Sequence, residues 1–202
     1  MSEPPDGLDL SLNEVETLAQ KAARGAGLPW GVAEDTGRAA AWVARRVGPW
    51  AGQLLALLEA PPPQDESPLL LAGALADQSV SRHLARVALP LWALPGLLTT
   101  LSRPLALRLD GTAAEIHCNP GEAASASVPA EALAALTAAS LALVFSDVAL
   151  PALPYRLEAR CRRSLVPGAA WRRLEALALR TYVPASDHSR RTGAGAGLLD
   201  DE

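Results

Sequence analysis

The 202-residue chain is half apolar and one fifth charged, a composition typical of a soluble globular protein that folds without disulfides or metals. Its net charge of -4 argues against a dedicated nucleic-acid-binding protein, because neutralising phosphates requires a surplus of Lys and Arg. Two cysteines without a signal peptide favour a reducing cytoplasm. Arg86, Pro90 and Pro95 interrupt the one long apolar run, so no membrane span is expected.

Residues 1–9 are predicted to be disordered, and a helix follows them. Ser11 and Glu14 have the spacing of a capping box, which marks the start of this helix. Gly25 and Gly27 supply the left-handed backbone that ends it. Its predicted buried face consists of four apolar residues at helical spacing: Val15, Leu18, Ala19 and Ala22.

Three further helical regions are expected before residue 90. A second helix covers residues 31–47 and ends at Gly48–Pro49, and a third begins at Trp50. Residues 61–68 are a Pro-rich connector. Residues 69–88 are assigned to one or two further helices.

The pattern changes in residues 105–118, where apolar and polar side chains alternate with a period of two. Asp110–Gly111 lies at the centre of this run and is a strong signal for a two-residue hairpin turn. Arg108 and Glu115 then lie diagonally on one face, where opposite charges are favourable. The turn predicts three cross-strand pairs: Leu109 with Thr112, Leu107 with Ala114, and Leu105 with Ile116.

The remaining elements are two more strands and a closing helix. Residues 155–161 alternate in the same way, which places Cys161 on an inward face. Residues 140–145 are an apolar run that fits either a strand or the end of a helix. Residues 169–180 are predicted to form the last helix, with Trp171 among its inward side chains.

Helices, then antiparallel strands, then a closing helix indicate an α+β fold, with an N-terminal helical layer packed on a small antiparallel sheet. We expect one domain over residues 10–190. Its first part, 10–90, is predicted to be helical, and its second part, 91–190, to mix strands and helices. Residues 191–202 are expected to be a flexible Gly-rich tail.

The second helix carries a cluster of charged candidates. Glu34 and Asp35 lie four and three residues before Arg38, and both carboxylates fall in the first turn, where the helix dipole favours negative charge. These residues fit ordinary surface ion pairs worth a few tenths of a kcal/mol. The alternative is that Arg38 binds an anion, beside Trp30, while Glu34 or Asp35 acts as a general base.

The C-terminal segment holds the other candidates. His188 is a candidate acid–base residue, and Ser189 and Arg190 are candidate ligand-binding residues. A polar loop is the alternative, since Ser and Asp commonly form turns. Between residues 156 and 191 there are nine arginines, which would suit an anionic ligand.

No metal site and no cofactor are predicted. The chain lacks a P-loop and a nucleophile-elbow motif. The residues able to bind a metal have no zinc-finger or other close spacing: His83, His117, Cys118, Cys161 and His188.

The segment LNEVETLAQKAARGAGLPWGVAEDTGRAA (Leu12–Ala40) resembles the opening of a bacterial domain-of-unknown-function family of roughly this length. The segment Thr181–Gly197, with its TYVP and SRRTGAGAG stretches, resembles the C-terminal end of that family. The resemblance implies a soluble bacterial protein and brings no activity or cofactor with it.

The sequence therefore favours a non-catalytic accessory protein or small-ligand-binding protein of bacterial metabolism, whose partner is a protein or an anionic small molecule, and not nucleic acid or a membrane. The alternative is a small-molecule enzyme with a site where six polar residues meet: Glu34, Asp35, Arg38, His188, Ser189 and Arg190. Packing of residues 182–191 against residues 30–42 would favour the enzyme.

Overall fold

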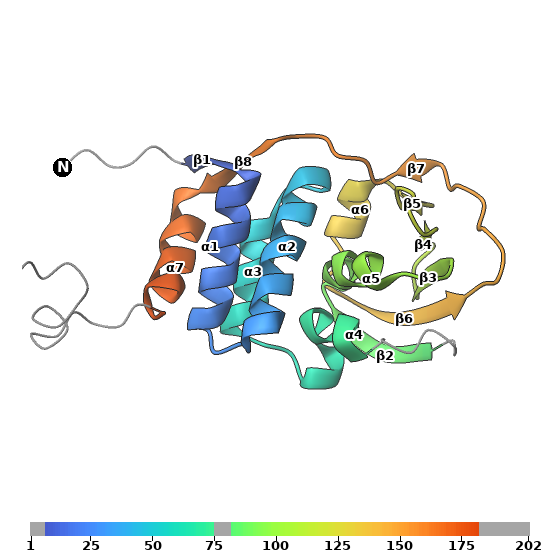
Figure 1. Cartoon of the computed structure of the whole chain (residues 1–202), viewed down its shortest axis with the longest axis horizontal. Coiled ribbons are helices and arrows are strands. Elements are labelled where there is room, and N and C mark those ends of the chain that lie inside the picture. The colour runs from blue at the N-terminus through green and yellow to red at the C-terminus, as the bar shows by residue number, and fades with distance from the viewer. Residues whose placement is uncertain (1–6, 75–81, 182–202) are drawn as a thin grey trace, which may run out of the picture.

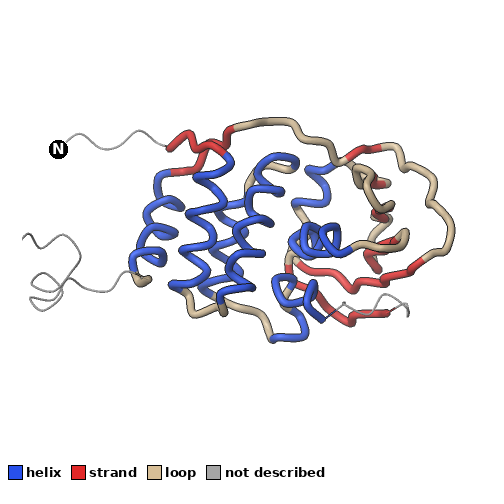
Figure 2. Tube along the Cα trace, in the orientation of Figure 1, coloured by secondary structure: helices blue, strands red, loops and turns tan. Residues whose placement is uncertain are grey.

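The computed structural model describes residues 7–74 and 82–181, which form helices and two antiparallel sheets (Figures 1 and 2). The α-helices are α1 (Leu12–Gly25), α2 (Trp30–Arg46), α3 (Trp50–Glu59), α4 (Pro68–Ala74), α5 (Leu94–Thr100), α6 (Ala130–Ala134) and α7 (Gly168–Leu179). Two 3-10 helices are η1 (Gln64–Glu66) and η2 (Pro90–Ala93). The strands are β1 (Gly7–Ser11), β2 (Arg82–Ala88), β3 (Leu105–Asp110), β4 (Glu115–Cys118), β5 (Ser125–Ala126), β6 (Ala138–Phe145), β7 (Tyr155–Arg156) and β8 (Arg163–Pro167). The predicted α+β class is confirmed.

A two-stranded sheet pairs the first described strand with the last one. Strand β1 pairs antiparallel with β8, with Gly7 opposite Pro167 and Ser11 opposite Arg163. Arg163 strengthens this pairing, because its Nε lies 2.6 Å from the Asp9 carboxylate. The predicted disorder of residues 1–9 is therefore wrong for residues 7–9. A pairing partner so distant in sequence leaves no local signal.

Helix α1 begins as the sequence predicts. The Glu14 backbone N–H donates to the Ser11 hydroxyl at 3.3 Å, and the Ser11 N–H donates to the Glu14 carboxylate at 2.7 Å. These two hydrogen bonds complete the capping box. The predicted apolar face is buried: Val15, Leu18, Ala19 and Ala22.

The helical layer is built around α1, which packs between α2 and α7 (Figure 1). Small residues set the distances between these helices. A Cβ placed on Gly37 would lie 2.8 Å from the Glu16 carbonyl oxygen of α1. A Cβ on Gly25 would lie 1.7 Å from the Leu177 carbonyl oxygen of α7. Glycine is therefore required at both crossings.

The six-stranded sheet lies beside the helical layer, on the side away from α7 (Figure 1). Its strand order is β2-β6-β3-β4-β5-β7. Leu107 and Leu141 from the sheet are buried together with Leu94 of α5 and Leu133 of α6. Strand β6 confirms the strand alternative for residues 140–145, and helix α7 confirms the predicted closing helix.

The predicted helical region 10–90 contains strands at both of its ends. Residues 82–88, assigned to a helix, form β2 and pair with β6. Periodicity alone does not separate a short apolar strand from a buried helix segment, so it cannot distinguish the two structures here. Helix α4 confirms a helix over residues 69–74 of the predicted helical stretch, and residues 75–81 lie outside the described residues.

The β3–β4 hairpin forms, but its register differs from the prediction. Leu107 lies opposite Ile116, Leu105 opposite Cys118, and Arg108 directly opposite Glu115. The loop is longer than the predicted two-residue turn, and the Thr112 hydroxyl donates to the Leu109 carbonyl within it. A slip of two residues keeps every side chain on the same face, so alternation cannot detect it.

The predicted strand over residues 155–161 is mostly absent. Only Tyr155–Arg156 pair as β7. The Arg160 N–H instead donates to the Arg45 carbonyl at 2.8 Å, which draws the chain away from the sheet toward the end of α2. Cys161 is half-buried there, with its thiol 3.3 Å from the Ala44 carbonyl, rather than on an inward sheet face.

Candidate functional site

The charged candidates on α2 pair with one another. Arg38 Nη1 lies 2.9 Å from the Asp35 carboxylate, and Arg38 Nη2 lies 3.5 Å from the Glu34 carboxylate. All three side chains are about half exposed. Contacts of this kind contribute a few tenths of a kcal/mol each. The roles assigned to Arg38, Glu34 and Asp35 in ligand binding or catalysis stay predictions.

The C-terminal candidates His188, Ser189 and Arg190 lie outside the described residues, as does the proposed contact of residues 182–191 with residues 30–42. The described chain ends at Thr181, immediately after α7. Thr181 lies beside α1 and Trp30, because all of them line one pocket.

Trp30 is held in place at the start of α2, although its side chain is 64% exposed. The Arg24 guanidinium lies 5.0 Å from the centroid of the indole ring, within the range of a cation–π contact. Arg24 Nη1 also donates to the Leu28 carbonyl at 2.5 Å, which fixes the guanidinium against the turn between α1 and α2. An exposed aromatic face therefore stands beside an oriented cation.

These two residues belong to a pocket of about 490 Å³ at the C-terminal ends of α1 and α7, which we call the basic pocket. Its size lies in the range of small-molecule sites. Three of its seven described lining residues are cationic, and none is acidic. The lining residues are Thr17, Gln20, Lys21, Arg24, Trp30, Arg180 and Thr181.

The fold explains why positive charge gathers at this place. Helices α1 and α7 both end here, and their carbonyl ends carry partial negative charge that cations complement. Gly25 brings the two ends into contact, since no side chain separates it from Leu177. Arg24 and Arg180, far apart in sequence, thus line the same pocket.

A groove of about 390 Å³ lies beside the basic pocket, along α1 and α7, and we call it the apolar groove. It shares Thr17 and Lys21 with the basic pocket. Most of its exposed lining is apolar. Its lining residues are Leu10, Asn13, Glu14, Thr17, Leu18, Lys21, Trp171, Glu175, Ala178 and Leu179.

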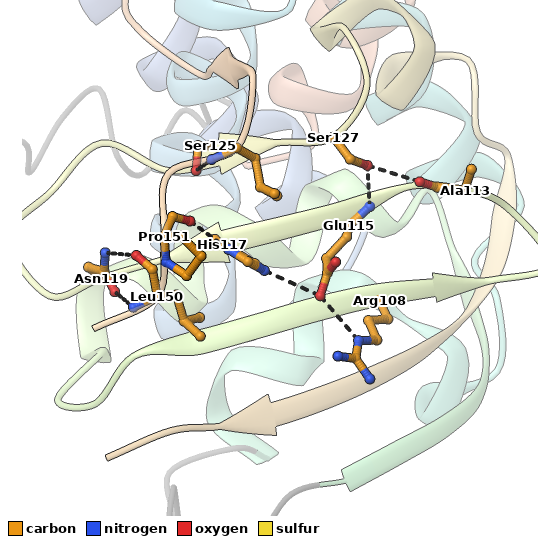
Figure 3. A network of polar contacts seen from close by, with 10 residues as sticks. Arg108, Ala113, Glu115, His117, Asn119, Ser125, Ser127, Leu150 and Pro151 are labelled. Carbon is orange, nitrogen blue, oxygen red and sulfur yellow. Dashed lines mark hydrogen bonds and ion pairs between the residues drawn. The ribbon is translucent and has the colours of Figure 1, made fainter. Parts of the chain in front are cut away.

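A second polar region surrounds His117 on β4 (Figure 3). His117 Nδ1 lies 2.8 Å from the Pro151 carbonyl oxygen, and Nε2 lies 3.2 Å from the Glu115 carboxylate. The same carboxylate accepts from Arg108 Nε at 3.1 Å. Both ring nitrogens therefore face oxygen acceptors, so neither is available to take a proton from a substrate in this arrangement.

The surrounding contacts attach a loop to the sheet. The Asn119 side chain accepts from the Leu150 N–H at 2.9 Å and donates to the Leu150 carbonyl at 3.0 Å. The Ser125 hydroxyl accepts from the Leu153 N–H at 3.0 Å. Figure 3 shows these side chains directed from the sheet toward the loop. We interpret the network as a structural attachment, even though it borders a polar pocket of about 380 Å³.

The electrostatics of Glu115 give a testable consequence. Burial raises the pKa of its carboxyl, but hydrogen bonds from Arg108 and His117 outweigh burial and hold the pKa below its ordinary value. A carboxylate with a lowered folded-state pKa stabilises the fold above its unfolded pKa of about 4.3. This stabilisation is lost as the pH falls through the folded pKa.

We expect Glu115→Gln to lower the free energy of unfolding by about 1 kcal/mol at pH 7, because it removes charge from two hydrogen bonds. The deficit should shrink toward zero below about pH 4, where wild type loses the same charge. Urea denaturation at several pH values measures this difference in the free energy of unfolding, and Glu158→Gln, at an exposed position, is the control. A deficit that is the same at pH 3 and pH 7 would contradict this account.

The cysteines show no sign of reactivity. Cys118 is buried, as predicted, and burial raises the pKa of its thiol to about 12. Cys161 is also a free thiol. Within residues 7–74 and 82–181, no group of three or more His, Cys, Asp or Glu residues is arranged to hold a metal ion.

A family model described as a protein of unknown function (DUF3726) matches residues 10–70. The match spans α1, α2 and α3 and reaches α4, so it confirms a resemblance to a family of unknown function at the N-terminal end. It does not extend to Thr181–Gly197, where the sequence also suggested one. No curated protein and no solved structure matches the chain. None of the described helices has the length and apolar character needed to cross a bilayer.

Sequence reasoning nominated Trp30 but not Lys21, Arg24 and Arg180. A signal for the first two was present: Thr17, Lys21 and Arg24 follow at helical spacing and form a polar stripe on α1. Arg180 joins them only through the packing of α7, which no local spacing reveals. The Arg108–Glu115–His117 contacts were hidden for a related reason, since the predicted hairpin register did not place Arg108 directly opposite Glu115.

Proposed function

We propose that this protein is a non-catalytic binding protein for a small anionic ligand, and that the ligand occupies the basic pocket. The observation that carries this proposal is the convergence of Lys21, Arg24 and Arg180 beside the exposed ring of Trp30. Guanidinium groups form strong, directional hydrogen bonds with carboxylates and phosphates. None of the described lining residues is acidic, so the described lining has a net positive charge that favours an anion.

The chemistry of the lining favours binding over catalysis. The described lining residues include no carboxylate, imidazole or thiol, which are the groups that most often transfer protons or attack substrates at neutral pH. An enzyme at this place would need such a group from outside the described lining of the basic pocket, for example the nominated His188. The proposal retains the bacterial cytoplasm as the compartment, which the free thiols Cys118 and Cys161 support.

The proposal shifts the anion-binding role from Arg38 to Arg24 and Arg180. Arg38 lies two turns after Trp30 on α2, and its guanidinium already contacts Asp35 and Glu34. Arg180 lines the pocket directly. Both arginines are exposed, so either can be replaced by Gln without creating a buried unpaired group.

The test is a titration of wild type with inorganic phosphate and with hexanoate at low salt, followed by tryptophan fluorescence. We expect both anions to bind, and Arg180→Gln to weaken both about tenfold or more, because it removes a charge-assisted hydrogen bond. Arg38→Gln serves as the matched control and should bind like wild type. Absence of binding by wild type, or loss of binding in Arg38→Gln alone, would contradict the proposal.

A further inference from the structure

The apolar groove adds a second recognition element to the basic pocket. Leu18, Ala178 and Leu179 line it on the faces that α1 and α7 turn toward each other. The Leu179 side chain is 60% exposed. A ligand lying in the groove would cover this exposed surface.

The groove and the basic pocket adjoin each other, because Thr17 and Lys21 line both. One end of the site therefore offers guanidinium groups, and the other offers aliphatic carbons. A single molecule that extends from one end to the other must have a charged head and an apolar chain.

An acidic residue at the end of the groove away from the basic pocket, Glu14, indicates that the ligand carries charge at one end only. Glu14 and Glu175 line the groove but not the basic pocket. The Glu14 carboxylate already accepts the Ser11 N–H, and hydrogen bonds from Ser11 hold the pKa of this carboxyl below its ordinary value. A second anionic group in the groove would meet these carboxylates and be repelled.

The dimensions of the site limit the length of the chain. Lys21 and Asn13 both line the groove and lie on α1, separated by about 12 Å at a rise of about 1.5 Å per residue. An extended chain of about ten carbons has this length. Leu10 and Trp171 line the groove as well and provide further apolar contact.

We propose that the ligand is a medium-chain aliphatic carboxylate, with its head in the basic pocket near Arg24 and Arg180 and its chain in the apolar groove. This inference rests on the proposed function and specifies the ligand class of the same site. The proposed ligand is a free carboxylate in solution, and the competing candidate is the anionic surface of a membrane.

The test is isothermal titration of the full chain with hexanoate, octanoate, decanoate and dodecanoate, each below its micelle concentration. Each methylene that enters the groove should raise affinity up to about fourfold, since burying one stabilises by about 0.8 kcal/mol. The increase should level off near decanoate. Decanedioate should bind more weakly than decanoate, because its second carboxylate would lie near Glu14 at the far end of the groove.

Two variants locate the chain in the groove. Leu179→Gln should flatten the dependence on chain length and leave phosphate binding unchanged. Leu165→Gln is the matched control, because Leu165 is 73% exposed and lines neither the groove nor the basic pocket. The variant should behave like wild type in both titrations.

The outcomes distinguish the two proposals. If phosphate and hexanoate bind through Arg180 but affinity does not rise with chain length, the ligand class is wrong and the proposed function stands. Equal affinity for decanedioate and decanoate also overturns the ligand class. If the protein binds phosphatidylglycerol vesicles but not free decanoate, the site binds a membrane surface, and the proposed ligand class is again wrong. If no anion binds wild type, both proposals fail.

Discussion

Replacing Gly25 by Ala should lower the free energy of unfolding by about 3 kcal/mol or more, since over-packing a close contact typically costs 1–3 kcal/mol and backbone cannot rotate aside. A Cβ at this position would lie 1.7 Å from the Leu177 carbonyl oxygen and 2.6 Å from its carbonyl carbon. Helices α1 and α7 would therefore have to separate. The same movement should weaken anion binding, because Arg24 and Arg180 stand on either side of this contact.

Urea denaturation of Gly25→Ala measures the effect, and Gly52→Ala is the matched control. Gly52 lies in α3, is exposed, and has open space where a Cβ would be added. Alanine should be neutral or stabilising there by about 0.5–1 kcal/mol, because glycine loses more backbone entropy on folding. Equal stability of Gly25→Ala and wild type would show that α1 and α7 are not packed this closely.

The second large effect is expected for Trp50→Ala, which should cost about 3–5 kcal/mol, as large-to-small changes of buried aromatics do. The Trp50 side chain is 1% exposed, and its indole N–H donates to the Ser164 hydroxyl at 3.2 Å. This residue connects α3 to β8, so its removal leaves a cavity where the helical layer meets the two-stranded sheet.

Trp30→Ala provides the contrast, because Trp30 is 64% exposed. Its removal should change the free energy of unfolding by no more than about 0.5 kcal/mol, as for other surface substitutions, while weakening anion binding. Thermal and urea denaturation, combined with the phosphate titration, separate the two roles. If Trp50→Ala lowered the free energy of unfolding by less than about 1 kcal/mol, the assignment of Trp50 to the core would be wrong. If Trp30→Ala unfolded readily, the assignment of Trp30 to the binding site would be wrong.

Local chemistry made much of the helical layer predictable. The capping box at Ser11 and Glu14 depends on residues three apart, and the apolar face of α1 depends on spacing within one helix. Both signals are complete within the segment that they describe. The closing helix α7 was predictable on the same basis, since Leu174 and Leu177 face the core at helical spacing.

Pairing between distant segments was not predictable in the same way. Strand β1 exists because β8 lies beside it, and β2 because β6 does. The β3–β4 register depends on a loop in which Thr112 donates to the Leu109 carbonyl, whereas alternation alone fits either register. Such features depend on tertiary contacts that are absent from any single window of sequence.

The candidate site shows the same division. Trp30 was nominated as a ligand-binding residue beside Arg38, and in the structure it lines the basic pocket. The sequence placed the anion-binding arginine on α2, where Arg38 has carboxylates at helical spacing. Only the packing of α1 against α7 brings Arg180 near Arg24, so the role proposed for Arg180 required the fold.

The most direct test of the central claim is a two-dimensional ¹⁵N–¹H NMR titration of the wild-type chain with hexanoate. The account predicts that the largest shifts occur at the Trp30 indole N–H and at the amides of Lys21, Arg24 and Arg180. The buried Trp50 indole should not move, and Arg180→Gln should abolish the shifts. Shifts centred on His117 and Asn119, or no shifts at all, would contradict the claim that the basic pocket binds anions.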